Sequence, residues 1–208
     1  VHADIDNDNW LDRLGSGKYC LNLQGTGRFA CSAFDMPTQS SMSQCFADLD
    51  GDGFVDAFIA GGAGNGQLDS VCMNENGDGF SCYPIGGNLY SRGATACDYD
   101  EDGDVDVFVS RYWFQPNHLF QNDGAGNLQD VCGYAGVCGA GHTISSAWGD
   151  FDNDGHFDIF ACNFNHHDFR RSEDAILYRN TGPDRGWRFE NIFTFDGGDW
   201  RTLFWRNT

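Results

Sequence analysis

The sequence predicts an all-β protein built from four similar units, and three observations support this prediction. An acidic phrase, D-x-D-x-D-[GN]-x-x-D, occurs four times and begins at Asp4, Asp48, Asp98 and Asp150. These starts lie 44, 50 and 52 residues apart, a spacing that indicates a repeat architecture. The segments on either side of the phrases are short, rich in β-branched or aromatic residues, and lack a helical period. We therefore expect four repeats made of strands.

The acidic phrase has the spacing of a calcium-binding loop. Carboxylates at positions 1, 3 and 5 converge only where the chain curls tightly, and Gly or Asn at position 6 tolerates the left-handed backbone that such a curl needs. The Asp at position 9 and the carbonyl at position 7 complete the six or seven oxygen ligands that Ca²⁺ accepts. Mg²⁺ is the second choice, because it prefers a tighter octahedron. Soft metals are not expected, since no thiolate or imidazole recurs at these positions.

We expect about four Ca²⁺ ions, one in each loop. The expected ligands are Asp4, Asp6, Asp8, Trp10, Asp12, Asp48, Asp50, Asp52, Phe54, Asp56, Asp98, Asp100, Asp102, Asp104, Asp106, Asp150, Asp152, Asp154, His156 and Asp158. The alternative interpretation, a solvated acidic turn, is disfavoured by four copies in the same register. The first loop has Asn9 where the others have Gly, but it keeps all four carboxylates.

The strands around the loops argue against an EF-hand, which needs a Glu at position 12 and two flanking helices. The acidic loops instead run into strand-like residues 57–60, 107–110 and 159–162. Later in each unit an apolar strand, a turn of Gly, Asn and Asp, and a second apolar strand follow one another, as in a hairpin. Each unit then holds four strands in about fifty residues, which is the size of a β-propeller blade.

The combination of the acidic phrase with an Asn-x-Gly-x-Gly hairpin resembles the FG-GAP/VCBS repeats of integrin-α-like β-propellers. The stretches Asn117-His-Leu-Phe-Gln-Asn-Asp-Gly and Ala147-Trp-Gly-Asp-Phe-Asp-Asn-Asp-Gly look especially like the cartilage-acidic-protein (ASPIC/UnbV-associated) branch. The resemblance covers residues 1 to about 193. It implies a calcium-loaded extracellular propeller, usually of about seven blades, that serves adhesion or assembly.

We expect one propeller domain, or part of one, over residues 1–208, with units at 1–37, 38–88, 89–139 and 140–193. The chain has four units and starts inside a blade, so it is either a segment of a longer propeller or a ring of unusual construction. Residues 194–208 lack the acidic phrase and end in a strand-like run that begins at Leu203. This segment is expected either to close the ring or to begin a degenerate fifth blade.

The charge of the chain also bears on its partners. The formal net charge is −19, and sixteen of the 31 acidic residues are loop carboxylates, so four Ca²⁺ ions would bring the charge to about −11. Without ions the clustered carboxylates repel one another, and the fold is expected to depend on calcium. The remaining acidity argues against nucleic acid and anionic membranes as partners. The sequence also has no run of eighteen apolar residues, so no membrane insertion is expected.

Nine cysteines in a chain with this calcium pattern point to an extracellular, secreted or cell-surface protein. Three disulfides are expected, each within a unit: Cys20 with Cys31, Cys72 with Cys82, and Cys132 with Cys138. Cys45, Cys97 and Cys162 remain, and the pairing among them is open. The odd count leaves one thiol free or bridging to another chain. Several cysteines could instead be small buried hydrophobes.

Two loops are candidates for ligand or partner contacts. The first is the insertion 163–174 in the fourth unit, which carries His166, His167, Arg170 and Arg171 and would suit a transition metal, an anion or a protein. Its alternative is a solvated loop with paired charges. The second loop carries Tyr112, Trp113 and Phe114, which would suit a sugar or a partner surface. Its alternative is a wedge between blades.

The preferred functional hypothesis is an extracellular calcium-binding propeller that acts as a structural, adhesion or assembly module and not as an enzyme. Its partners would be other protein chains, including copies of itself or the rest of a larger propeller. A lectin-like, carbohydrate-binding module is the alternative. An enzyme with a site at the propeller axis is less favoured, because the chain has no Gly-x-Ser-x-Gly elbow and no base placed by a known motif.

Overall fold

The computed structural model of the chain describes residues 2–15, 17–34, 41–62, 68–87, 90–164 and 175–195. The insertion residues His166, His167, Arg170 and Arg171 lie outside the described residues, as does the C-terminal segment from 196 to 208. Among the described residues, no helix combines the length and the apolar character needed to cross a membrane.

Four antiparallel sheets of four strands make up most of the structure, as the sequence predicted. The first contains β1 (His2–Ala3), β2 (Asp12–Gly15), β3 (Lys18–Asn22) and β4 (Phe29–Ala33). The second contains β5 (Ser41–Ala47), β6 (Asp56–Gly61), β7 (Asp69–Asn74) and β8 (Phe80–Ile85). The third contains β9 (Ser91–Cys97), β10 (Asp106–Arg111), β12 (His118–Gln121) and β13 (Gln129–Asp130). The fourth contains β15 (Thr143–Gly149), β16 (Asp158–Asn163), β17 (Ala175–Asn180) and β18 (Phe189–Phe195).

Smaller elements lie within and between the third and fourth sheets. They are β11 (Gln115–Pro116), which pairs with β14 (Ala140–Gly141), the single helical turn α1 (Cys132–Ala135), and the 3₁₀ turn η1 (Pro183–Arg185). Strands within each sheet follow chain order, so each strand pairs with the strands that precede and follow it in that sheet. This up-and-down topology is that of a propeller blade.

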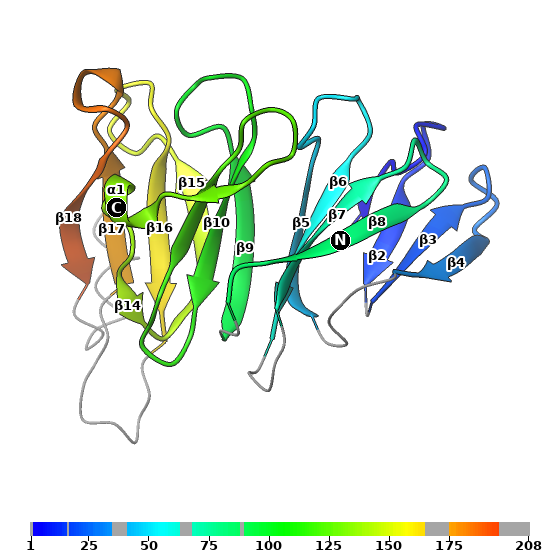
Figure 1. Cartoon of the computed structure of the whole chain (residues 1–208), viewed down its shortest axis with the longest axis horizontal. Helices are drawn as coiled ribbons and strands as arrows, with labels where there is room; N and C mark the ends of the chain where they lie inside the picture. The colour runs from blue at the N-terminus through cyan, green and yellow to red at the C-terminus, as the bar shows by residue number, and fades with distance from the viewer. Residues whose placement is uncertain are drawn as a thin grey trace, which may run out of the picture.

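The four sheets stand side by side in chain order (Figure 1). The first strands of the second, third and fourth sheets, β5, β9 and β15, are direct neighbours. This arrangement is consistent with a propeller-like fold. The described residues do not form a closed ring.

The core lies between successive sheets, and strand alternation explains it. In β6, Ala57 and Ile59 pack with residues of the first sheet, whereas Phe58 and Ala60 pack with the third. Successive side chains of a strand point to opposite faces, so a sheet with neighbours on both sides buries both faces. This is why all six residues of β6, and likewise all six of β10, are buried.

The three disulfides expected from the sequence are present. Cys20–Cys31 and Cys72–Cys82 each link the two strands of a hairpin at directly opposite positions. Cys132–Cys138 closes a short loop that contains α1. The pairing that the sequence left open does not occur, because the remaining residues are three free thiols: Cys45, Cys97 and Cys162.

Candidate metal centres

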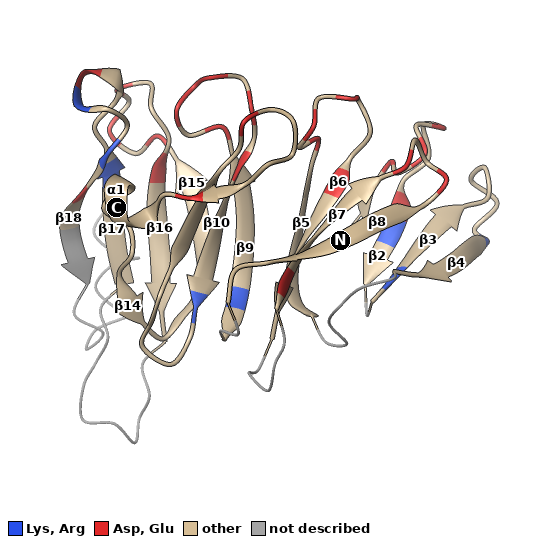
Figure 2. Cartoon of the chain, viewed as in Figure 1, with Lys and Arg blue, Asp and Glu red and all other residues tan. Residues whose placement is uncertain are grey.

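The four acidic loops join the first strand of each sheet to the second. Because the sheets stand side by side in the same orientation, all four loops lie at one end of the molecule. Figure 2 shows the acidic residues gathered at this end. The candidate centres therefore form a row along one rim of the four sheets.

Three carboxylates converge in each loop, with candidate ligand atoms within 4.8 Å of one another. In the second, third and fourth loops they come from positions 1, 3 and 9, as in the group Asp98, Asp100 and Asp106. In the first loop they come from positions 1, 3 and 5, which are Asp4, Asp6 and Asp8. The carboxylates of Asp12, Asp52, Asp102 and Asp154 stand outside these groups. The four-carboxylate clusters expected from the sequence thus appear as groups of three.

Backbone hydrogen bonds hold each loop in its curl. In the second loop Asp48 accepts from the N–H groups of Gly51 at 2.8 Å and Gly53 at 2.9 Å, and Asp52 accepts from Phe54 at 2.8 Å. Position 6 is left-handed, with φ of 89° at Gly53 and 70° at Asn9. Since Asn tolerates this conformation, the first loop adopts the same curl without glycine.

Position 4 is also left-handed in all four loops, a feature that the sequence analysis missed. The residues are Asn7, Gly51, Glu101 and Asn153, with φ of 56°, 74°, 56° and 59°. The glycine and asparagines at this position could have indicated a left-handed backbone, but Glu101 in the third loop breaks the pattern. In the first and third loops this turn directs the position-4 side chain to the next loop. Asn7 donates to the carbonyl of Gly53 at 3.1 Å, and Glu101 lies 2.7 Å from His156 Nδ1.

In the part of the chain that the structure describes, some oxygens of the converging carboxylates lack hydrogen-bond donors, and like charges crowd one another. Buried oxygens of Asp6, Asp98 and Asp100 have no hydrogen-bond partner among the described residues. Burial raises the pKa of Asp106 to about 8 and that of Asp56 to about 6. Neighbouring carboxylates act in the same direction, because each disfavours charge on the others. A site made only of crowded oxygen ligands fits a hard divalent cation.

The position-9 aspartate has a structural role beside its candidate ligand role. In the second loop Asp56 accepts from the N–H of Leu49 at 2.8 Å and from the N–H of Asn74 at 2.7 Å. Asp12, Asp106 and Asp158 accept the same pair of hydrogen bonds in their sheets. This residue thus ties each acidic loop to the hairpin of its own sheet.

An asparagine at the hairpin of the second, third and fourth sheets extends this tie to the preceding sheet. The side-chain amide of Asn74 donates to the carbonyl of Ile5 at 2.9 Å, Asn122 to Leu49 at 2.8 Å, and Asn180 to Tyr99 at 2.9 Å. Sequence reasoning gave these asparagines only a turn role. The recurrence of asparagine at the same place in every hairpin indicated a shared role. That role could not be identified from the sequence, because the acceptor carbonyls lie 69 to 81 residues away.

The aromatic loop lies at the other end of the sheets, beyond the last residue of β10. Trp113 and Phe114 are 49% and 54% exposed, so they do not act as the wedge that was the alternative interpretation. Both have left-handed backbone, with φ of 59° and 57°. The His142 ring supports the loop, with its centroid 4.5 Å from that of Tyr112 and 4.4 Å from that of Phe114. Exposed rings on strained backbone are typical of a binding site.

Part of the chain matches a known family of repeats. The family model of the FG-GAP-like repeat matches residues 98–161. This segment is similar to an FG-GAP-like repeat. It begins at the third acidic loop and ends in β16, so the acidic loops at both ends of the FG-GAP-like repeat belong to the row of candidate centres. The resemblance to FG-GAP repeats that the sequence indicated is confirmed over residues 98–161.

Among solved structures, the chain is similar to a lectin of Agrocybe aegerita described as specifically recognising non-reducing terminal N-acetylglucosamine. The two share 19% sequence identity with a TM-score of 0.56, over 94% of this chain and 51% of that chain. The chain thus spans about half the length of the lectin. At this identity the likeness concerns the fold alone. No curated protein sequence matches the chain.

Proposed function

We propose that the chain is an extracellular, calcium-binding β-propeller module that binds other molecules and performs no catalysis. The observation that carries the proposal is the convergence of three carboxylates in each of four loops, with buried oxygens of Asp6, Asp98 and Asp100 left without partners. Ca²⁺ accepts such oxygen ligands in flexible geometry. The FG-GAP-like repeat at residues 98–161 supports the same assignment.

The role proposed for the ions is to hold the sheets together. When bound, Ca²⁺ supplies the positive charge that the crowded carboxylates lack. The position-9 aspartate then keeps its bonds to the hairpin asparagine of its sheet, and that asparagine keeps its bond to the preceding loop. Binding to the folded state alone stabilises it by mass action.

Asp100→Asn tests the calcium proposal, because it removes one converging carboxylate with little change of shape. We expect calorimetric titration of the wild type to give about four Ca²⁺ per chain and the variant to give about three, in the affinity range of extracellular sites. The variant should melt at lower temperature in calcium and at equal or higher temperature in chelator. Asp123→Asn, in an exposed hairpin, is the matched control. An equal loss in both conditions would show that Asp100 does not act through an ion.

Three disulfides favour an oxidising, extracellular location for the module. The partners proposed are other protein chains, including copies of this chain or further blades of a larger propeller. Light scattering of the purified chain in calcium and in chelator tests this. Assemblies that dissociate on chelation support the proposal, and a monomer under both conditions contradicts self-association.

A second candidate function is glycan binding at Tyr112, Trp113 and Phe114. The observation that favours it is the pair of exposed rings on left-handed backbone, braced by His142. The similar fold of the Agrocybe aegerita lectin supports it. We expect N-acetylglucosamine to quench tryptophan fluorescence, and Trp113→Ala to abolish the change. Trp10→Ala is the control, because Trp10 is similarly exposed at 47% but lies on the first acidic loop.

A further inference from the structure

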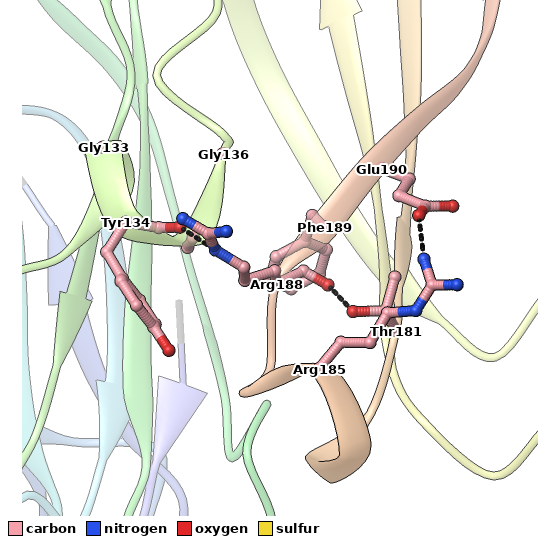
Figure 3. A pocket seen from close by; sticks show the side chains of 9 residues that line it. Gly133, Tyr134, Gly136, Thr181, Arg185, Arg188, Phe189 and Glu190 are labelled. Atoms are coloured by element: carbon pink, nitrogen blue, oxygen red, sulfur yellow. Dashed lines mark hydrogen bonds and ion pairs between the residues drawn. The ribbon is translucent and has the colours of Figure 1, made fainter.

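A pocket of about 420 Å³ lies where the third sheet meets the fourth. One wall is the segment around α1, including Gly133, Tyr134 and Gly136, and the other is the turn between β17 and β18 (Figure 3). The buried ring of Phe189 also lines it. Its volume falls within the range of small-ligand sites.

The geometry of the two walls keeps the pocket narrow. A Cβ atom built at Gly186 would lie 2.5 Å from the Tyr134 hydroxyl, and one at Gly136 would lie 3.0 Å from the carbonyl of Phe189. Both glycines have left-handed backbone, with φ of 71° and 85°. Larger residues at these positions would push the walls apart. The close approach of turn and tyrosine therefore depends on glycine at both sites.

Arg188 presents a fixed positive group in this pocket. Its Nε donates to the carbonyl of Tyr134 at 3.0 Å, and its guanidinium carbon lies 4.9 Å from the centroid of the Tyr134 ring. Among the described residues, its two terminal amino groups have no hydrogen-bond partner. A guanidinium held at one edge and stacked on one face is preorganised to donate two parallel bonds to a planar anion.

The second cation of the pocket, Arg185, is paired with Glu190 on the same wall. The lining therefore carries two positive charges and one negative charge. The pocket thus contrasts with the acidic loops, where many of the acidic residues of this chain of net charge −19 gather. A singly charged anion would therefore be attracted to this pocket, whereas the acidic loops would repel it.

A pocket in a corresponding place between the second and third sheets lacks this feature. It has about 390 Å³ and is lined by Met73, Tyr83, Ile85 and residues 125–128, with a tyrosine but no arginine or lysine. An apolar or aromatic body alone would fit either pocket. Of these two pockets, only the one that contains Arg188 adds a cationic donor for a carboxylate.

We propose that the Arg188 pocket binds a small monocarboxylate, with the carboxylate on the Arg188 guanidinium and a ring or other flat body beside Tyr134. The carboxylate belongs either to a sugar acid or to the C-terminus of a peptide, since both present the same planar anion. The inference is independent of the calcium proposal, because none of the acidic-loop residues line this pocket.

The test compares each carboxylate with a neutral analogue on calcium-saturated protein. D-glucuronate is paired with D-glucose, and N-acetylphenylalanine with its amide, each titrated to about 20 mM because a single exposed contact gives millimolar affinity. Backbone amide shifts of Gly133 and Gly136 in NMR spectra locate the binding. We expect one carboxylate or both to bind about tenfold more tightly than the neutral partner. The carboxylate that binds more tightly identifies the source.

Two variants separate the guanidinium from general effects. Arg188→Met should bring carboxylate and neutral analogue to equal affinity. Arg92→Met is the matched control, because Arg92 also stacks on a tyrosine, 4.8 Å from the Tyr112 ring centroid, but outside the pocket. The proposal is overturned if neither carboxylate shifts Gly133 and Gly136, if carboxylate and analogue bind equally to the wild type, or if both variants weaken binding alike.

Discussion

Asn122 in the hairpin of the third sheet donates its side-chain amide to the carbonyl of Leu49 in the acidic loop of the second, at a distance of 2.8 Å. The same amide also reaches the carbonyl of Val105 in its own loop, at 3.2 Å. One side chain therefore bridges two candidate metal loops. Leu49 is 1% exposed and Asn122 is 4% exposed, so water cannot replace either partner of this hydrogen bond. We therefore expect a change in the geometry of one loop to affect the other.

We predict that Asn122→Ala lowers the free energy of unfolding by roughly 1–3 kcal/mol, because the buried Leu49 carbonyl loses its donor. Urea unfolding in saturating calcium measures the change. The effect should include weaker calcium binding in the second loop, although that loop keeps all its carboxylates. Asn127→Ala is the control, since the Asn127 side chain bonds only in an exposed turn. Equal destabilisation by both variants would contradict a bridging role for Asn122.

The calcium-free protein should become less stable as the pH rises. Burial raises the pKa of Asp106 to about 8, above its ordinary value of 3.8, so the folded state favours the neutral carboxyl. The stability contributed by this proton is complete below the unfolded pKa and is lost as the pH rises through about 8. Between pH 6 and 8 the expected loss is on the order of 2 kcal/mol.

Melting curves in chelator across this pH range measure the effect. Saturating calcium should remove the dependence, because the bound ion holds the carboxylates ionised. Asp106→Asn should flatten the calcium-free curve, since the amide does not titrate. A melting temperature that rises from pH 6 to pH 8 in chelator would run against the prediction.

The ion pair between Arg111 and Asp69 joins the second and third sheets at a buried position. The Arg111 NH2 group lies 2.8 Å from Asp69 Oδ2, and the two side chains are 0% and 1% exposed. We predict that Arg111→Met costs about 3–5 kcal/mol, because it leaves a buried carboxylate without its cation. Adding Asp69→Asn should recover most of this loss while keeping the bond from the Gly61 N–H. Simple additivity of the two changes in a double-mutant cycle would refute the coupling.

Free thiols should be protected in the native protein. Burial raises the pKa of both Cys45 and Cys97 to about 12, so almost no thiolate is present at pH 8. We expect iodoacetamide to label these residues only after unfolding. Mass spectrometry under non-reducing conditions should then find three alkylated cysteines and three intact disulfides. Rapid labelling of native Cys45 would show that its environment is more open.

Much of the fold was predictable because it follows from local patterns. The acidic loops, the strands on both sides of them and the hairpins depend on residues within about ten positions of one another. The Cys20–Cys31 and Cys72–Cys82 disulfides were predictable for the same reason, since each pair sits opposite across one hairpin.

Contacts between sheets could not be predicted in this way. Arg111 lies beside an aromatic loop in the sequence, yet its side chain is buried against Asp69, 42 residues earlier. Arg188 and Tyr134 line the two walls of one pocket, although they lie 54 residues apart in the sequence. Local sequence patterns do not predict contacts between residues this far apart.

By itself, therefore, the sequence determined four repeats, the acidic loops and the strand pairing within each unit, because short-range periodicity and turn chemistry decide these. Only the tertiary structure decided which three carboxylates converge in each loop, which asparagines bridge neighbouring loops, and where an unpaired guanidinium faces a pocket. The physical reason is that these features depend on how one sheet packs against the next, and that packing brings together residues that lie far apart along the chain.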